Sequence, residues 1–312
     1  IMVPLVVFIT SSLFSCKQLP GTYVNPFIGT LGSGNTFMGA SLPYGMVQLG
    51  PWLRYTDDGS KGTIYGFSHT HVSGMAGGGN KAPGDIIFLP ITEDNESSGN
   101  VPSVRIKAFQ SGFSHSSEIA APGYYKVFLD DYNITTELTA TTRTGFHKYI
   151  FPEKRYPAVV LKLGNGSLTV NGNEISGYNG KIYFFAKFSK PVKSYALSGI
   201  DAVVDETGTI KGRNLTALFR FETGPHKAIF LKTGISMVNI EGAEKNLEKE
   251  LPGWNFDMVR NNAMKIWNRE LSKIKVEGGT RNDRTIFYTA LYHVLTHPNI
   301  YMDVDRKYRS TN

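Results

Sequence analysis

The spacing of apolar residues changes character once along this chain, near Glu241, and that change limits the folds open to it. Before this point, apolar and polar residues alternate in short runs, as around Tyr125, Val127 and Leu129. Alternation of this kind is typical of strands with one buried face. After it, apolar residues recur every three or four positions, as in amphipathic helices. The sequence therefore predicts a mainly β domain followed by helices, with the boundary within residues 241–280.

The β portion is divided into many short segments. Pro and Gly interrupt residues 24–51 every few positions, which favours short strands and tight turns over long helices. Residues 134–151 are expected to form one long strand, and Asn171-Gly172 is a hairpin signal. Further strands are expected at residues 158–163, 168–175, 182–188, 192–197, 217–221 and 228–233. Many short strands without a repeat of about 20 to 50 residues predict a two-sheet β-sandwich rather than a propeller or solenoid.

Helices are expected after the sandwich. One is indicated by apolar residues at helical spacing, namely Met258, Val259, Ala263, Ile266 and Trp267. Another is expected to begin after Thr280, an N-cap residue followed three positions later by Asp283, and to end before Pro298. The aromatic and aliphatic stripes of both helices are expected to be core positions rather than parts of a cofactor site.

These patterns divide the chain into a sandwich domain at residues 22–240, a helical linker at 241–279 and the start of a helical domain at 280–312. A helical domain that has only just begun cannot bury its own apolar stripe. We therefore interpret the sequence as a fragment whose continuation is helical.

Composition supports a folded protein and argues against one class of partner. The chain has 312 residues, of which 41% are hydrophobic and 19% charged, so it can bury a substantial core. Its formal net charge is +7, but the Lys and Arg residues are scattered singly, with no basic run interleaved with aromatic residues. We therefore expect no nucleic-acid partner.

The N-terminal residues suggest export. Residues 3–14 form an apolar run with the length of a signal-peptide core, too short to span a bilayer. The sequence from Leu13 to Cys16 then resembles a bacterial lipobox, in which the cysteine thiol is lipidated. Residues 1–16 are accordingly interpreted as a signal peptide, and Cys16, the only cysteine, as the lipid-anchor site. The alternative is a buried or free cysteine beside an apolar strand. An anchored protein would lie in the bacterial envelope and touch the membrane through its lipid alone.

Residues 65–85, YGFSHTHVSGMAGGGNKAPGD, combine two histidines, aromatic and hydroxyl side chains, and a run of glycines. On a strand, His69 and His71 would point to the same face, because side chains alternate with a period of two. The glycines allow the backbone to turn or to approach another surface closely. This combination suits a polar binding wall. A pair of surface histidines before a flexible loop is the alternative, and two imidazoles without further ligands fall short of a zinc site.

Several blocks of the sequence, in order, resemble glycoside hydrolase family 92. They are VNPFIGT (24–30), GASLPYGMVQLGP (39–51), IYGFSHTHVSG (64–74), GD (84–85), PGYYKVFLDDYNITTELTATTRTGFHKYIFP (122–152) and FYTALYHVLTHPNIYMDVD (287–305). The family comprises bacterial, calcium-dependent, inverting exo-α-mannosidases. The resemblance implies an N-terminal β-sandwich, linker helices and the truncated start of an (α/α)6 barrel, with the active site between sandwich and barrel.

The same resemblance assigns roles to residues. The general-acid Glu, the general-base Asp and the ligands of Ca²⁺ lie deeper in the barrel of family members, so no catalytic or metal-binding residue is expected up to Asn312. His69 and His71 match the FSHTH block, and Asp303 and Asp305 match the DVD motif. All four are expected to bind sugar hydroxyls, Asp303 and Asp305 those of the sugar in the −1 subsite, with plain helix capping as the alternative for the aspartates.

The sequence departs from the family pattern at three places. Ser33 and Asn35 stand where histidines are common, and Met38 stands where proline is common. The connection between Trp52 and Tyr65 is short and lacks the tryptophan-rich segment that helps form the leaving-group subsite in some members. Residues 306–307 are Arg-Lys where Gly-Arg is usual. Linkage preference therefore does not follow from the resemblance.

The leading hypothesis is the N-terminal part of an exported enzyme that removes terminal, α-1,2-linked mannose from N-glycan or mannan substrates, the fragment alone being inactive. Its partners would be a mannose-containing oligosaccharide and the C-terminal (α/α)6 domain. A non-catalytic carbohydrate-binding sandwich is the main alternative. Cleavage of the glycan–asparagine amide is a weaker one, because no nucleophile or acid–base set for it is found.

Overall fold

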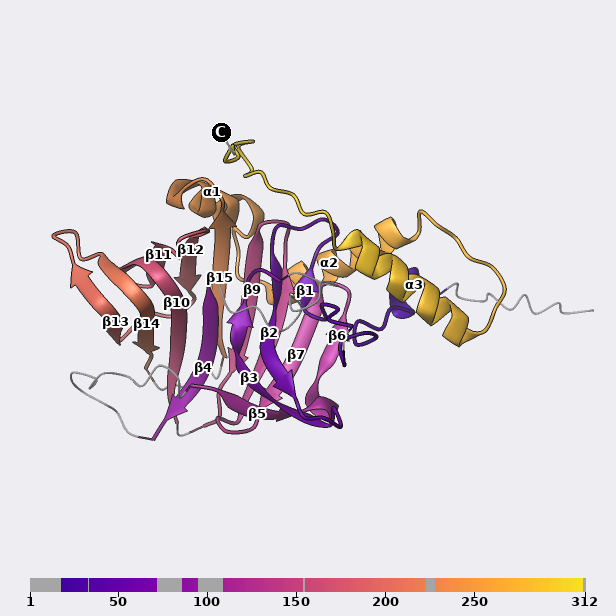
Figure 1. Cartoon of the computed structure of the whole chain (residues 1–312), viewed down its shortest axis with the longest axis horizontal. Coiled ribbons are helices and arrows are strands. Elements are labelled where there is room, and N and C mark those ends of the chain that lie inside the picture. Colours follow the sequence, from indigo (N-terminus) through magenta and orange to yellow (C-terminus); the bar gives the residue numbers. More distant parts are fainter. Residues whose placement is uncertain are drawn as a thin grey trace, which may run out of the picture.

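A computed structural model describes residues 18–32, 34–71, 86–94, 109–153, 155–222 and 228–310. Mainly antiparallel strands precede three helices at the C-terminal end, which confirms the expected mainly β fold class (Figure 1). The strands are β1 (Ala40–Ser41), β2 (Gln48–Tyr55), β3 (Lys61–Ser68), β4 (Ile87–Glu93), β5 (Ser111–Ser114), β6 (Ile119–Ala121), β7 (Tyr124–Leu129), β8 (Ile134–Ala140), β9 (Thr144–Ile150), β10 (Tyr156–Asn171), β11 (Glu174–Tyr178), β12 (Tyr183–Phe188), β13 (Ser194–Val204), β14 (Ile210–Arg220) and β15 (Ala228–Ser236). The helices are α1 (Ile240–Glu250), α2 (Phe256–Leu271) and α3 (Arg281–Leu295).

The two layers of the sandwich are joined into one hydrogen-bonded path. Its order is β1-β2-β3-β4-β10-β11-β12-β15-β9-β8-β7-β6, with β5 beside β3, and β14 between β10 and β13. The path bends so that the β2–β3–β4 side faces β7–β8–β9 across one apolar core. Contact across the layers is direct: the ring of Phe88 in β4 meets the His147 ring in β9 edge-on, with centroids 6.0 Å apart. A two-sheet sandwich was expected, and the bend through β10–β12 and β15 links its two layers.

Two stretches differ from the strands expected from the sequence. Residues 134–151 form a hairpin, β8–β9, because the chain turns where Thr141 donates its backbone N–H to Thr144 O at 2.9 Å. Residues 158–175 contain a single long strand, β10, up to Asn171, whose pairing with β14 shifts register around Gly164 and Gly166. The positive φ angles of these glycines, 77° and 159°, let the strand continue through the irregularity. The hairpin expected at Asn171-Gly172 is confirmed, between β10 and β11.

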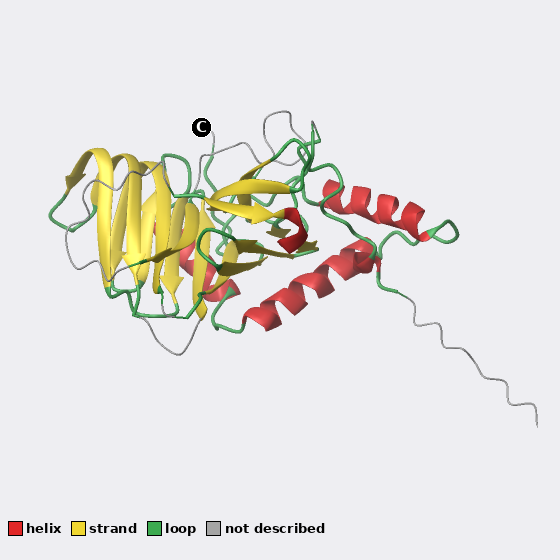
Figure 2. Cartoon of the chain, turned by 90° about the horizontal axis from the view of Figure 1, so that it is seen from below, coloured by secondary structure: helices red, strands yellow, loops and turns green. Residues whose placement is uncertain are grey.

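The helices pack on the sandwich rather than on one another alone. Helix α1 lies against β12 and β15, where Asn246 donates to Ile235 O at 2.8 Å. Helix α2 covers β7 and β8, and Trp267 donates its indole N–H to Ser41 O at 2.7 Å. In Figure 2 the two longer helices, α2 and α3, lie at one end of the sheets. Within the described residues, no helix is both long enough and apolar enough to cross a bilayer.

Helix α3 begins as the sequence predicts. Thr280 is its N-cap and forms a capping box with Asp283. Tyr292 on its inner face packs on Trp267, with ring centroids 4.4 Å apart. Its outer face leaves Ile286 and Val294 exposed, at 56% and 68%. After α3 the chain returns across the sheets towards α1 (Figure 1).

Candidate functional site

His69 lies in the core of the sandwich. Its side chain is fully buried just after β3, where Nδ1 is 2.8 Å from Ile86 O and Nε2 is 3.1 Å from His147 Nε2. The Tyr149 hydroxyl is 2.8 Å from His147 Nδ1. One direction of donation satisfies all three contacts: Tyr149 donates to His147, His147 donates through Nε2–H to His69, and His69 donates through Nδ1–H to Ile86 O. Burial lowers the pKa of His69 to about 4 and that of His147 well below its usual value, so both rings are neutral donors and acceptors.

His71 is buried as well, with 7% of its surface exposed. Its Nδ1 lies 2.9 Å from Gln48 O, and its ring packs on Phe37 at a centroid distance of 4.8 Å. Burial lowers the pKa of His71 to about 4. Gln48 in turn donates its side-chain amide to Thr296 O, just after α3, at 3.1 Å. The two histidines are therefore not the surface pair considered as an alternative, and His71 is linked through Gln48 to the helical part of the chain.

Asp303 joins the C-terminal segment to α1. It is 2% exposed, and its two carboxylate oxygens accept from Ser236 Oγ at 2.6 Å and from Asn246 Nδ2 at 2.7 Å. Asp305 lies nearer the surface, with Lys245 Nζ at 3.4 Å and Lys307 Nζ at 3.5 Å. Neither residue caps a helix of the described chain. The structure thus places the predicted histidines and aspartates in two different hydrogen-bond networks.

The described residues contain no cluster of acidic or other metal-ligating side chains. Calcium prefers six to eight oxygen ligands, and this part of the chain contains no group of three or more His, Cys, Asp or Glu that could hold a metal ion. The oxygens of Asp303 are occupied by Ser236 and Asn246, and Asp305 faces two lysines. Cys16, the glycines 77–79 and Ser33 lie outside the described residues, so their predicted roles stay predictions.

A cavity of about 530 Å³ opens at the half of the β2–β3 hairpin that lies farther from His69 and His71. Its wall includes Trp52 and Tyr65, which face each other across the hairpin with ring centroids 4.9 Å apart. The register of β2 and β3 shifts directly after Trp52, which leaves Tyr65 as the extra residue of a bulge. The cavity is lined by Thr30, Leu31, Gly32, Asn35, Trp52, Leu53, Arg54, Tyr55, Thr56, Asp57 and Tyr65.

The sequence did not predict this cavity, because its most conspicuous polar residues are the histidines. The available signal was the aromatic residues Trp52, Tyr55 and Tyr65 in one short hairpin next to the loop of residues 30–35. Trp52, Tyr55 and Tyr65 are each only half-buried, unlike the aromatic residues of the core. Asn35 adopts a positive φ of 52°, which Asn tolerates better than most residues, and so helps shape the rim.

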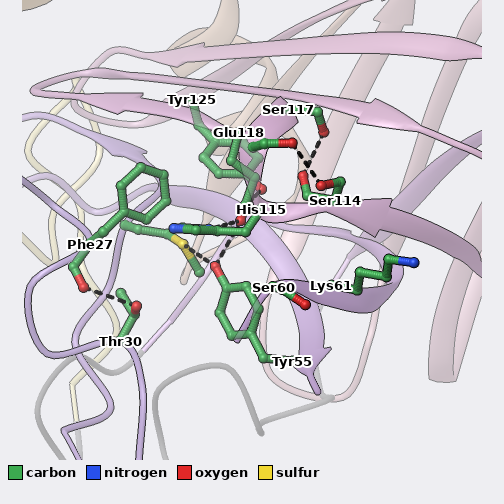
Figure 3. Close-up of polar contacts among 12 residues, drawn as sticks. Phe27, Thr30, Tyr55, Ser60, Lys61, Ser114, His115, Ser117, Glu118 and Tyr125 are labelled. Carbon is green, nitrogen blue, oxygen red and sulfur yellow. Dashed lines mark hydrogen bonds and ion pairs between the residues drawn. The ribbon is translucent and has the colours of Figure 1, made fainter. Parts of the chain in front are cut away.

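A buried carboxylate supports one wall of the cavity (Figure 3). Glu118 has a side chain with no exposed surface, and it accepts hydrogen bonds from the hydroxyls of Tyr55, at 2.9 Å, and of Tyr125. His115 Nδ1 lies 2.7 Å from the same carboxylate. Burial and the adjacent carboxylate raise the pKa of Tyr55, so its phenol stays protonated and donates.

Comparison with protein families decides what kind of protein this is. The model of the glycosyl hydrolase family 92 N-terminal domain matches residues 23–236, and that of the family 92 catalytic domain matches residues 242–312. The chain belongs to glycosyl hydrolase family 92. The resemblance drawn from the sequence blocks is thereby confirmed.

Solved family 92 structures share the fold. The family GH92 alpha-mannosidase BT3965 from Bacteroides thetaiotaomicron is 30% identical, with a TM-score of 0.77 over 92% of this chain and 43% of its own. The family GH92 inverting mannosidase BT2199 from the same organism is 24% identical, with a TM-score of 0.75 over 91% of this chain and 40% of its own. A curated relative from Arthroderma benhamiae, called an uncharacterized secreted glycosidase, is 26% identical over 89% of this chain and 42% of its own length. The chain therefore spans less than half the length of these family 92 relatives.

Proposed function

We propose that the full-length protein containing this chain is an exo-acting α-mannosidase that inverts configuration and removes terminal α-1,2-linked mannose from N-glycans or mannans. Family membership and the mannosidases among its solved structural relatives support this proposal. A structure of BT3965 in complex with mannoimidazole also matches this chain, at 30% identity. The division into residues 22–240, 241–279 and 280–312 remains part of the proposal, as does a C-terminal (α/α)6 domain covering the exposed face of α3.

The observation that best supports a sugar-binding role is the composition of the cavity wall. A pyranose ring presents C–H groups on its faces and hydroxyls around its edge. The paired rings of Trp52 and Tyr65 offer an apolar surface, while Thr30, Asn35, Arg54 and Asp57 offer hydrogen-bond donors and acceptors. Small-molecule sites commonly combine an aromatic lining with a few polar groups. We therefore infer that this cavity binds part of the oligosaccharide.

The chemistry would be a single displacement. An inverting glycosidase needs an acid and a base roughly 6.5–9.5 Å apart so that water fits between base and sugar. We propose that both carboxylates lie in the part of the family 92 catalytic domain that this chain does not include. The role of the present chain is then to bind and orient the sugar. The 312 residues alone are expected to show no turnover.

Substrate binding by His69, His71, Asp303 and Asp305 stays a proposal. His69 joins the β2–β3 hairpin to β9, and His71 bonds Gln48 O, while the Gln48 side chain reaches Thr296 O. Asp303 holds the C-terminal segment on α1. Any contact of these four with a sugar would be made in addition to those bonds. Calcium dependence likewise rests on the family resemblance, and the ion would be held by residues outside this chain. Export with a lipid on Cys16 is also proposed, and the name of the secreted relative supports export alone.

Activity of the full-length protein is the decisive test. It should release mannose from α-1,2-mannobiose faster than from the α-1,3, α-1,4 and α-1,6 isomers, and nuclear magnetic resonance should detect β-mannose as the first product. Activity should fall on chelation of divalent ions and return with calcium. Detection of α-mannose as the first product would refute inversion of configuration. Faster release from the α-1,3, α-1,4 or α-1,6 isomer would refute the α-1,2 preference.

A non-catalytic carbohydrate-binding module is the second candidate, because the cavity lies within the sandwich and needs no helical residue for its lining. Binding of mannan by the full-length protein, with no mannose release from any of the four disaccharides, would favour this candidate over the enzyme.

A further inference from the structure

Glu118 is unusual among the carboxylates described here because it is both sealed from solvent and shared by two tyrosines. Its side chain has no exposed surface. Oε2 accepts from the Tyr55 hydroxyl at 2.9 Å and lies 2.7 Å from His115 Nδ1, while Oε1 accepts from the Tyr125 hydroxyl. A carboxylate buried this deeply is costly unless its oxygens are hydrogen-bonded. The three partners therefore fix the carboxylate, and it in turn fixes them.

Tyr55, the first partner of Glu118, is part of the cavity wall. Tyr55 is the last residue of β2 and lines the cavity together with Trp52 from the same strand. Without a bond at its hydroxyl, a half-buried tyrosine ring at a strand end can change rotamer and alter the width of the cavity. The hydroxyl is instead held by Glu118 and also lies 3.3 Å from Met38 Sδ. The orientation of this ring thus depends on a residue that does not itself line the cavity.

His115, the second partner of Glu118, contacts Phe27, which bonds another residue of the cavity lining. The His115 ring meets Tyr55 edge-on at 5.8 Å and Phe27 edge-on at 4.8 Å. Phe27 O accepts from Thr30 Oγ1 at 3.0 Å, and Thr30 lines the cavity. Figure 3 shows this series of contacts running from Glu118 through His115 and Phe27 to Thr30. One carboxylate therefore supports both Tyr55 and the loop that carries Thr30.

Tyr125, the third partner of Glu118, connects the carboxylate to the β7–β8–β9 layer of the sandwich. Tyr125 is fully buried in β7, on the opposite side of the sandwich core from β2. Its bond to Glu118 connects the cavity wall to a strand that cannot move without disturbing the core. Burial and the nearby carboxylate raise the pKa of Tyr125 well above its usual value, so its phenol stays protonated and donates to Glu118.

We propose that Glu118 is a positioning residue for sugar binding, which acts through Tyr55 and through the His115–Phe27–Thr30 contacts to set the width of the cavity. This inference rests on the proposed function, because it assumes that the cavity receives part of the substrate. It concerns binding rather than chemistry, since the Glu118 side chain is sealed behind the wall and does not line the cavity.

The test compares E118Q and Y55F in the full-length protein. E118Q keeps the size of the side chain but gives the tyrosines and His115 a neutral partner with one acceptor oxygen. Y55F removes the hydroxyl alone. Each variant should raise KM for the preferred disaccharide about fivefold while kcat changes less than twofold. The double variant should raise KM no further than E118Q alone, because the Tyr55 hydroxyl acts on the cavity through Glu118.

Glu137 provides a matched control. It also accepts from a tyrosine hydroxyl, that of Tyr124 at 2.7 Å, and pairs with Lys148 at 2.8 Å, but neither it nor its partners line the cavity. E137Q should lower the thermal midpoint and leave KM unchanged. A merely structural role for Glu118 predicts the same outcome for E118Q, and that result would overturn the proposal. If E118Q fails to fold, Y55F decides alone, and an unchanged KM overturns the proposal.

A second readout separates this inference from the proposed function. The indole N–H resonance of Trp52, assigned with W52F, reports on the cavity wall without substrate. It should shift in E118Q and in Y55F but not in E137Q. If the full-length protein cleaves no mannoside, the proposed function fails, yet a shifted Trp52 resonance still supports positioning of the wall by Glu118. An unshifted resonance in both variants overturns it.

Discussion

The two halves of the β2–β3 hairpin carry different kinds of polar and aromatic residues. At one end, His69 and His71 are buried against β9 and the start of β2, and their imidazoles are neutral. At the other, Trp52, Tyr55 and Tyr65 are half-buried around a cavity. One half is packed into the sandwich, and the other lines an open cavity. The contrast shows that a conspicuous polar motif can mark a buried network, while the open cavity beside it is lined by less conspicuous residues.

The largest effect expected from this contrast is the loss of stability in His69→Ala. The substitution leaves Ile86 O and His147 Nε2–H without partners and opens a cavity in the core. Unsatisfied buried groups and lost packing together cost about 3 kcal/mol of unfolding free energy. Urea denaturation of the parent chain and of His69→Ala measures this loss of unfolding free energy. Tyr65→Ala, on the same hairpin but half-exposed, is the control and should cost much less. Equal losses would contradict the division of the hairpin.

A smaller loss is expected where the C-terminal segment meets α1. Asp303→Asn replaces one acceptor oxygen with a donor opposite Ser236 Oγ or Asn246 Nδ2, which should lower the unfolding free energy by about 2 kcal/mol. Asp305→Asn is the matched control, and its loosely paired side chain should leave stability unchanged. If Asp303→Asn instead unfolds like the parent chain but abolishes mannoside binding, its carboxylate acts on the sugar rather than on the fold.

The buried histidines also predict how stability depends on pH. The pKa of His71 is about 4 in the folded chain, against about 6.5 when unfolded. Above pH 6.5 His71 is neutral in both the folded and the unfolded state, so its contribution to the unfolding free energy is fully present. As the pH falls from 6.5 to 4, only the unfolded state gains the proton, so the unfolding free energy falls by up to about 1.4 kcal/mol per pH unit.

Denaturation of the parent chain and of His71→Gln across this range measures that slope, because the contribution of the carboxylates cancels in the difference. The parent chain should lose more stability than the variant between pH 6.5 and 4. Parallel curves would show that the imidazole protonates in the folded state, and hence that it is accessible.

The sequence predicted the elements better than their environments. Local signals sufficed for the capping box at Thr280 and Asp283, for α2 and for the hairpin at Asn171-Gly172, because each depends on a few adjacent residues. Family blocks identified the fold. The burial of His69, in contrast, depends on His147 and Tyr149, which lie about eighty positions away in a strand of the other layer. Alternation predicts that two histidines share a face but not which face is sealed.

The cavity was missed for a related reason. Its wall depends on a bulge at Tyr65, where the register shifts after Trp52, and on a carboxylate, Glu118, from a different part of the chain. The spacing of Trp52, Tyr55 and Tyr65 on an ideal hairpin does not place their rings around one space. Only the shifted register brings Trp52 and Tyr65 together, and no local pattern of residues signals that shift.

The smallest effect is expected at the open half of the hairpin, and it should appear in binding rather than stability. Trp52→Ala removes one of the two facing rings of the cavity but leaves the core and the histidine network intact. KM of the full-length protein for its preferred disaccharide should rise roughly fivefold, equivalent to ~1 kcal/mol of binding free energy. Trp254→Ala is the control, since that ring packs on Lys232 and Phe146, away from the cavity, and should leave KM unchanged. An unchanged KM in Trp52→Ala, with normal folding, would mean that the sugar does not reach this wall, and the hairpin would then be structural along its whole length.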